Sequence, residues 1–451
     1  MNRGGRPGMQ RGKWSAAVVL ALIAWVFSFP SVSPGALLTL PEGLRLATGD
    51  NRLIRIAQRE ENISRADSLI LKAKLLPEVN ASAGGTALAY QPAAIFGAET
   101  VPVSEKDFLA YSVSIQQTLY DFRKDASLYE AGKVILNTKT IDTRRVRNLV
   151  ALHFGLTYFD LLESEKMLKV AEQEVERLEA HLRDAKNLYE EGVITKNDLL
   201  QAEVKISDAK QRLSTAKSLR SITASRLNNI LVRPLKSEIE VTDAYVKELE
   251  ELPEDLLTLD SEAAWKTAEK QRPEILIADE TLRALDLRER ARKAEYYPRL
   301  FVKGGYDFTE NRYMVHEGNW SVTLGLSVNL YSGGSTKAEI MKLEEQKSKL
   351  LEEKNNLIDQ IKLELETYLL DSRTAGERVA VTKDAVKQAE ENLRINRVKY
   401  EEGVGTATDV LDAVTLLTIA ETNYYRAVYD LNRAEAAVLY SMGADLAQVY
   451  K

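Results

Sequence analysis

Proline divides this chain into two long stretches that are free to form helices. The 451 residues include 11 prolines, but none lies between Val103 and Arg233 and none follows Pro298. A proline inside a helix removes a backbone hydrogen bond and clashes with the preceding turn, so long proline-free stretches permit very long helices.

The segment from about Asp121 to Glu191 has the strongest helical pattern. It is rich in Ala, Leu, Glu, Lys and Arg, and apolar residues recur at steps of four and three, close to a coiled-coil period. These residues are Met167, Ala171, Val175, Leu178, Leu182, Ala185 and Tyr189. At 1.5 Å per residue, about 70 residues form a rod of roughly 105 Å, much longer than a helix of an ordinary globular domain.

The chain is a duplicated unit. The sequence YEEGV occurs at Tyr189–Val193 and again at Tyr400–Val404, 211 positions later. The same separation joins Tyr120 with Tyr331, Leu182 with Leu393, Arg183 with Arg394, and Asp198 with Asp409. A repeat of this length predicts two equivalent halves, which we place at residues 36–251 and 252–451.

The first 35 residues have the layout of a secretory signal peptide. Basic residues precede an apolar run from Ala16 to Phe29, and small residues follow it. This run is shorter than the roughly 20 residues of a membrane-spanning helix, which argues against a retained anchor. The predicted signal carries four of the 61 basic residues and none of the 67 acidic ones, so the remaining chain has an excess of ten acidic residues. Nucleic acid is therefore an unsuitable partner, and the absence of cysteine excludes disulfides and thiolate metal sites.

Each half also contains a pair of predicted β-strands, near 78–119 and near 299–331. Pro77 and Pro298, which precede these pairs, are 221 positions apart rather than 211, so the first half has about ten extra residues between its two strands. Between Trp320 and Leu330, apolar residues alternate with Ser, Thr, Gly and Asn, and a shorter alternation runs from Leu109 to Gln116. Such a strand fits a membrane barrel with lipid on one face and water on the other, or a half-buried hairpin on a soluble core. The predicted export, the duplication and the flanking aromatic residues favour the membrane barrel over the soluble hairpin. Four strands cannot close a barrel, whereas three copies of the chain supply twelve.

Several motifs resemble the TolC-like outer membrane efflux protein family. They are Leu75-Leu76-Pro77, Leu119-Tyr120-Asp121, Arg272-Pro273-Glu274 and the run GTATDVLDA from Gly405 to Ala413. The resemblance extends from about Leu40 to Ala444 and includes the doubled pattern. It implies a mainly α fold with transmembrane β-strands, in which a homotrimer forms a twelve-stranded barrel in outer membrane lipid above a coiled-coil helical tunnel in the periplasm. It also implies shorter helices beside the two long ones, from roughly Pro41 to Leu76, Asn197 to Leu231, Ser261 to Tyr297 and Thr408 to Met442.

The resemblance also implies a function without catalysis or cofactor. It predicts the exit duct of a tripartite efflux system for small molecules, working with a periplasmic adaptor protein and an inner-membrane pump. Alternatives are the duct of a type I protein secretion system and, from another class, a periplasmic coiled-coil scaffold or adaptor. An enzyme is disfavoured because His153, His181 and His316 lack metal-ligand spacing, and GGSTK at 333–337 lacks the first glycine of a phosphate loop.

Two matched turns are predicted where the long helices reverse, at Gly192-Val193 and Gly403-Val404. A glycine after a helix C-terminus allows the chain to reverse, and this structural role alone would explain both turns. The resemblance implies in addition that these tips dock the adaptor. Thr195 with Asp198, and Thr406 with Asp409, have the spacing of capping boxes for the helices that follow.

Asp412 is not explained by capping, since it lies one turn deeper and its repeat equivalent is the neutral Gln201. Asp409 and Asp412 share one helix face, and the resemblance implies that they ring a pore constriction. Asp198 and Tyr400 match positions that hold the family's entrance closed, so we expect a hydrogen bond between them. The basic residue that the family places in this lock is absent, because the aligned position is Gly405.

Overall fold

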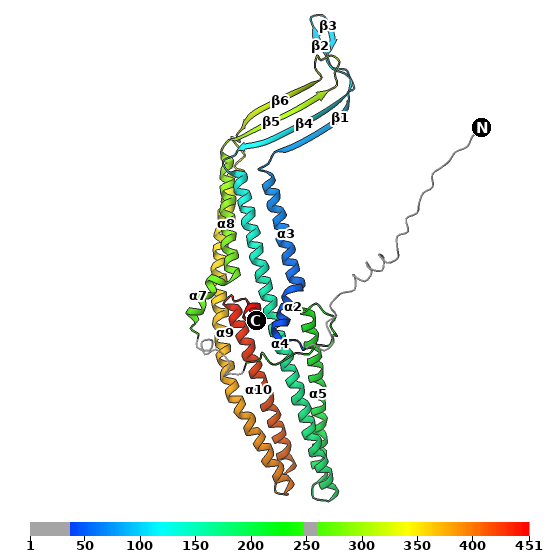
Figure 1. The fold of residues 1–451 in the computed structure, drawn as a ribbon, viewed down its shortest axis with the longest axis vertical. Helices are drawn as coiled ribbons and strands as arrows, with labels where there is room; N and C mark the ends of the chain where they lie inside the picture. The colour runs from blue at the N-terminus through cyan, green and yellow to red at the C-terminus, as the bar shows by residue number, and fades with distance from the viewer. Residues whose placement is uncertain (1–36, 248–258, 451) are drawn as a thin grey trace, which may run out of the picture.

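A computed structural model describes residues 37–247 and 259–450. The predicted signal peptide at 1–35 and the boundary between the halves at 251 and 252 lie outside the described residues. The described chain is a long helical rod with a tilted β-sheet at one end (Figure 1).

Two helices of 67 residues run the length of the rod, as predicted. Helix α4 spans Lys124–Glu190 and helix α9 spans Ser335–Glu401. Both the first and the last residues of the two helices are separated by 211 positions, so the sequence repeat is also a repeat of structure. At 1.5 Å per residue each helix is about 100 Å long.

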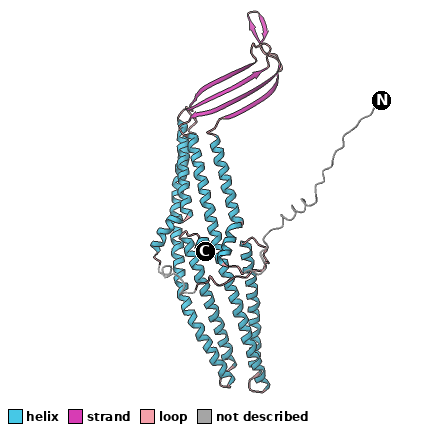
Figure 2. Ribbon diagram, viewed as in Figure 1, coloured by secondary structure: helices cyan, strands magenta, loops and turns pink. Residues whose placement is uncertain are grey.

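Shorter helices complete two successive layers around α4 and α9 (Figure 2). Nearer the sheet, α3 and α8 pack on α4, and α8 also packs on α9; at the other end, α5 and α10 pack on α4, and α10 packs on α9. The bounds are Leu40–Asp50 for α2, Arg52–Ala73 for α3, Lys196–Ile230 for α5, Ser261–Gln271 for α7, Pro273–Lys293 for α8, Ala407–Ser441 for α10 and Leu446–Val449 for α11.

Two helices predicted as continuous are each broken in the structure. The expected helix from Pro41 to Leu76 is interrupted at Asn51, whose side-chain oxygen accepts a hydrogen bond from the Leu53 N–H and so caps α3. The expected helix from Ser261 to Tyr297 is interrupted before Pro273, where the ring excludes the α conformation at the preceding residue. A short 3₁₀ helix at Ala294–Tyr296 follows α8.

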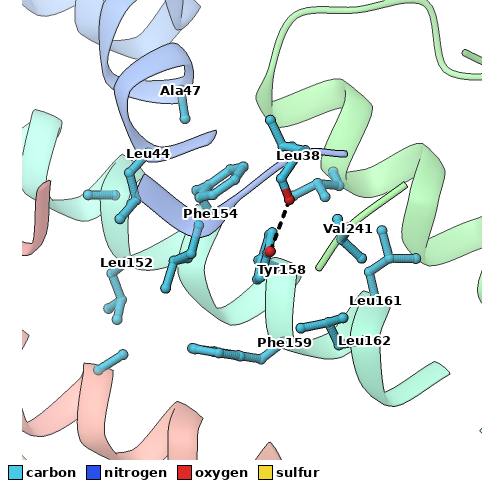
Figure 3. Packing of buried hydrophobic residues seen from close by; sticks show 14 of the residues in the cluster. Leu38, Leu44, Ala47, Leu152, Phe154, Tyr158, Phe159, Leu161, Leu162 and Val241 are labelled. Atoms are coloured by element: carbon cyan, nitrogen blue, oxygen red, sulfur yellow. Dashed lines mark hydrogen bonds between the residues drawn. The ribbon is translucent and has the colours of Figure 1, made fainter. Parts of the chain in front are cut away.

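The largest apolar cluster lies at mid-height, around the centre of α4 (Figure 3). Phe154, Tyr158 and Phe159 are fully buried there, against residues of α2, α5 and α10. The Tyr158 hydroxyl lies 3.0 Å from the Leu38 carbonyl oxygen and 2.7 Å from that of Thr242. It therefore holds both the start of the described chain and the segment that follows α5 against the middle of α4.

The sheet is antiparallel, in the order β1-β4-β5-β6. Its strands are β1 (Glu78–Ala87), β4 (Asp107–Tyr120), β5 (Arg299–Thr309) and β6 (Gly318–Ser327). The sequence predicted these four strands, although the last one ends three residues before Leu330. The extra residues of the first half form a separate hairpin, β2 (Ala93–Phe96) with β3 (Glu99–Pro102), which was not predicted.

Each long helix is entered through two successive residues with left-handed backbone. In the second half they are Gly333 and Gly334, with φ of 65° and 82°, and in the first half they are Phe122 and Arg123, with φ of 54° and 65°. Glycine adopts this conformation without steric cost. Phe122 is held there by stacking on Tyr297, with ring centroids 4.6 Å apart.

We predict that Gly334→Val destabilises the protein by about 1–2 kcal/mol, because a β-branched residue is strained at positive φ. An added Cβ at this position meets no atom within 4 Å, so the effect isolates backbone strain. Gly334→Asn is the matched control and should cost less, since Asn tolerates this region. Thermal unfolding followed by circular dichroism measures both, and equal midpoints for the two variants would contradict the explanation.

Candidate functional site

The sheet carries an apolar face that the described chain leaves uncovered. Trp320 and Val322 of β6 are 78% and 83% exposed, and Leu324 and Leu326 continue the same face. The register places Tyr306 opposite Trp320 and Val113 opposite Tyr306, so the apolar face extends across three strands. Ser112, Ser321 and Thr323 lie on the other face. The predicted alternation is confirmed.

The sheet also has two free edges among the described residues, because β1 pairs only with β4 and β6 only with β5. Unpaired N–H and C=O groups along a strand are strong hydrogen-bonding groups that require partners wherever water is absent. None of the described helices is both long and apolar enough to cross a membrane.

At the opposite end of the rod, the two long helices reverse at the predicted glycines. Gly192 and Gly403 have φ of 78° and 74°. The N–H of Val193 donates to the Leu188 carbonyl, and the N–H of Val404 donates to the Lys399 carbonyl. These are Schellman motifs, which require a left-handed residue after the helix. Val193 and Val404 project into solvent at the two tips.

Both helices that leave the tips begin with the predicted capping boxes. The Asp198 carboxylate accepts hydrogen bonds from the N–H and hydroxyl of Thr195, at 3.0 and 2.7 Å, and Asp409 does the same with Thr406. The hydrogen bonds from Thr406 hold the pKa of the Asp409 carboxyl below its usual value. Asp409 is therefore anionic at neutral pH.

Asp409 and Asp412 lie on one exposed face of α10, as predicted. Leu416 and Ile419 continue this face and are about half exposed, whereas Val410 and Val414 on the other side of the helix are buried. The helix thus presents two carboxylates followed by two apolar side chains to a space that the described chain does not fill.

The structure does not contain the expected hydrogen bond between Tyr400 and Asp198. The Tyr400 hydroxyl has no hydrogen-bond partner among the described residues. The Oδ2 atom of Asp198 accepts both hydrogen bonds of the Thr195 cap, and no hydrogen bond joins this carboxylate to Tyr400. Burial, with smaller contributions from Asp198 and Asp184, raises the pKa of Tyr400. Asp198 is thus close enough to act through its charge.

Tyr400 is instead a packing residue. It is 5% exposed and lies in a small apolar cluster with Leu188, Leu393 and Val410. Its ring centroid is 5.1 Å from that of the buried His181 on α4. Tyr189, the repeat equivalent of Tyr400, is 40% exposed. The two tips share a backbone but differ in what covers them.

Polar contacts between the two helical hairpins had no signal in the sequence. Arg177 of α4 forms a bidentate pair with Glu421 of α10, at 2.7 and 3.0 Å. Nearer the tips, the Thr408 hydroxyl lies 3.4 Å from the side-chain oxygen of Gln201. Because these partners lie more than 200 positions apart, no local pattern identifies them.

Gly405 lies close against the last turn of α9. A Cβ added there would lie 3.1 Å from both the Lys399 Cβ and the Tyr400 backbone nitrogen. A basic side chain at this position would therefore require the turn to shift, which agrees with its absence here.

Comparisons with known proteins identify the fold and the family. The family described as "Outer membrane efflux protein" matches residues 44–232 and 265–444. Nodulation protein T of Rhizobium leguminosarum bv. trifolii is 20% identical over 310 residues, which are 65% of this chain and 63% of that protein. The outer membrane protein TolC of Vibrio cholerae is 21% identical over 397 residues, covering 84% of this chain and 85% of the relative. A crystal structure of CusC, 17% identical, superimposes with a TM-score of 0.77 over 90% of this chain and 92% of its own.

The family match covers most of both halves, including the strands, the two long helices and the tips. With this match, the chain belongs to the outer membrane efflux protein family, and it is an outer-membrane duct with a large periplasmic helical portion rather than an enzyme.

Proposed function

We propose that this protein forms a homotrimeric exit duct that carries small molecules through the periplasm and outer membrane, together with a periplasmic adaptor and an inner-membrane pump. The observation that carries the proposal is the four-stranded sheet with an exposed apolar face and two free edges. In lipid, every backbone group on those edges must be paired, and a closed barrel pairs them all. Three copies joined from β1 to β6 provide twelve strands.

The helical rod supports the same assembly. In the layer nearer the sheet, α3 and α9 lie at opposite flanks (Figure 1). Ile56, Ile63 and Ile70 of α3 are exposed at heptad spacing, on the side of the helix opposite to its buried face. Leu363 and Leu370 of α9 are exposed on the side opposite to its buried residues, closer to mid-height. Packing α3 of one copy on α9 of the next covers the α3 stripe and closes a ring of helices.

We predict that the purified protein is a trimer and that Ile63→Glu weakens it. A charge in the apolar stripe of α3 is buried without a partner when two copies pack, which is costly. Mass measurement in mild detergent should give three chains for the unmodified protein and a substantial monomer fraction for the variant. Asn62→Glu is the matched control, because Asn62 lies about a quarter turn away on the same helix. A well-folded monomer before mutation would contradict the proposed assembly.

We further propose that Asp409 and Asp412 form the pore constriction. In a trimer they place six carboxylates around one axis, where clustered negative charge attracts multivalent cations. The double variant Asp409→Ala with Asp412→Ala should raise the concentration of a divalent or trivalent cation needed for half-block by at least about tenfold in planar bilayers.

The control for this experiment is Thr195→Ala. It removes the same capping contact at the other tip without changing the Asp409 and Asp412 face. Unchanged cation block in the double variant would contradict the assignment of Asp409 and Asp412 to the constriction. An equal loss of cation block in the control would contradict it as well.

Tyr400 and Asp198 remain our proposed closure residues, with packing as the main contribution. Since the Tyr400 hydroxyl has no partner, Tyr400→Phe should leave the resting conductance nearly unchanged, whereas Tyr400→Ala should raise it about tenfold or more by removing a buried ring between the hairpins. Single-channel recording measures both. Equal, non-additive increases for Tyr400→Phe and Asp198→Ala would instead demonstrate a hydrogen bond that forms in the assembled channel.

The adaptor-docking role of Gly192, Val193, Gly403 and Val404 also stays a proposal. Its support is geometric. The two turns reverse the helices at the far end of the rod from the sheet, and both valines are exposed there.

A further inference from the structure

A pocket of about 310 Å³ lies between α4, α9 and α10, above the Gly403 tip. Leu393, Val410, Val414 and Leu417 provide an apolar lining. Its volume is about twice the ~150 Å³ of an apolar cavity that accommodates benzene. The pocket is formed by helices from both halves of the repeat, and the equivalent position in the other hairpin is open to solvent at Tyr189.

Two buried polar atoms of this pocket have no hydrogen-bond partner among the described residues. They are Nε2 of His181, whose side chain belongs to a residue 4% exposed, and the hydroxyl of Tyr400. A buried polar group without a partner costs about 1–3 kcal/mol. The two rings come from different helices, α4 and α9, and their centroids lie 5.1 Å apart.

The three arginines that line the pocket are already paired with carboxylates. Arg177 binds Glu421, Arg394 binds Glu391 and Arg397 binds Glu401. Burial lowers the pKa of His181, with Asp184 opposing and Arg397 adding to this effect, so the imidazole is neutral near pH 7. An anionic ligand therefore finds no free cation among these groups, whereas a neutral ligand meets an apolar lining and two neutral hydrogen-bonding atoms.

We propose that this pocket binds a small neutral aromatic molecule with a hydroxyl group, a phenol in chemical class, with its ring against Leu393, Val410 and Val414 and its hydroxyl between His181 and Tyr400. Neutral His181 Nε2 accepts or donates according to its tautomer, and a phenol hydroxyl and Tyr400 can each do both. Water alone fits the lining less well, because it leaves the apolar surface of Leu393, Val410, Val414 and Leu417 hydrated. Binding to the folded chain is independent of the proposed transport function.

The chain contains no cysteine, which permits a direct test by single-cysteine chemistry. Ala180→Cys places a thiol in the pocket lining, and Asn187→Cys places one on the exposed surface of the same helix. Each purified variant is treated with ethyl, 2-phenylethyl and 2-(4-hydroxyphenyl)ethyl methanethiosulfonate, and mass spectrometry gives the modification rates. The rate at Asn187→Cys corrects for intrinsic reactivity and for partition into detergent.

We predict that the phenylethyl reagent modifies Ala180→Cys at least about tenfold faster than the ethyl reagent, after this correction, because the pocket holds its ring. The hydroxyl should add a further factor of about three to ten through its hydrogen bonds. In the Ala180→Cys background, Tyr400→Phe and His181→Leu should each reduce this hydroxyl advantage while leaving the preference for the ring.

Two results would overturn the proposal. Equal corrected rates for the three reagents mean that the pocket holds water only. A hydroxyl advantage that survives both substitutions means that His181 and Tyr400 do not bind the ligand. Circular dichroism of each variant shows whether it is folded, and Tyr400→Phe preserves the ring packing if His181→Leu does not fold.

Discussion

The junction around Tyr158 is the contact on which the rest of the structure depends. The helices α2, α3, α5, α10 and α11 each begin or end near the middle of α4, and helix ends leave backbone groups without intrahelical partners. The apolar cluster around Phe154 and Tyr158 covers this region, while the Tyr158 hydroxyl binds carbonyl oxygens of two chain segments that lie outside the helices. This junction lets a single long helix pack on α3 and α8 along one half of its length and on α5 and α10 along the other.

Duplication of the sequence has produced matching backbones in unlike surroundings. The left-handed residue that follows α10 is Gly443, with φ of 84°. The equivalent residue after α5 is Val232, with φ of 57°. Both positions belong to a Schellman motif, because the Arg233 N–H donates to the Asn228 carbonyl and the Ala444 N–H donates to the Leu439 carbonyl. The backbone requirement is thus retained even where the residue is poorly suited to it. Side-chain environments have diverged further, as the exposed Tyr189 and the buried Tyr400 demonstrate.

The features that could be predicted from the sequence are those that depend on neighbouring residues in the chain. The strand alternation, the glycine turns at the tips and both capping boxes depend on residues within a few positions of one another, and the structure confirms them. The break at Asn51 was missed because a single asparagine gives a weak signal, whereas the break at Pro273 was missed although proline rarely continues a helix. The β2–β3 hairpin was missed because only the extra length of the first half was evident.

Contacts between residues far apart in the sequence could not be predicted for a different reason. Asp198 was expected to serve both as a helix cap and as the partner of Tyr400, and the cap has the advantage of proximity, since Thr195 is three residues away on the same turn. The Arg177–Glu421 pair depends on how two hairpins meet, which no pattern within either half describes. For the same reason, His181 was considered only as a metal ligand and not as the neighbour of Tyr400.

The contacts between the hairpins are of a kind suited to reversible opening. Within each hairpin, α5 packs on the tip half of α4 and α10 packs on the tip half of α9, whereas α4 and α10 meet near the tips through one apolar cluster and a few polar links. The bidentate Arg177–Glu421 pair is partly exposed, and a charge-assisted bond of this type contributes about 1.5–3 kcal/mol. The nearby pocket leaves part of this boundary unpacked. In the proposed channel, movement of the tip ends of α9 and α10 away from α4 would break the Arg177–Glu421 pair and the Thr408–Gln201 contact, whereas the apolar cluster around Tyr158 would keep the other end of α10 against α4.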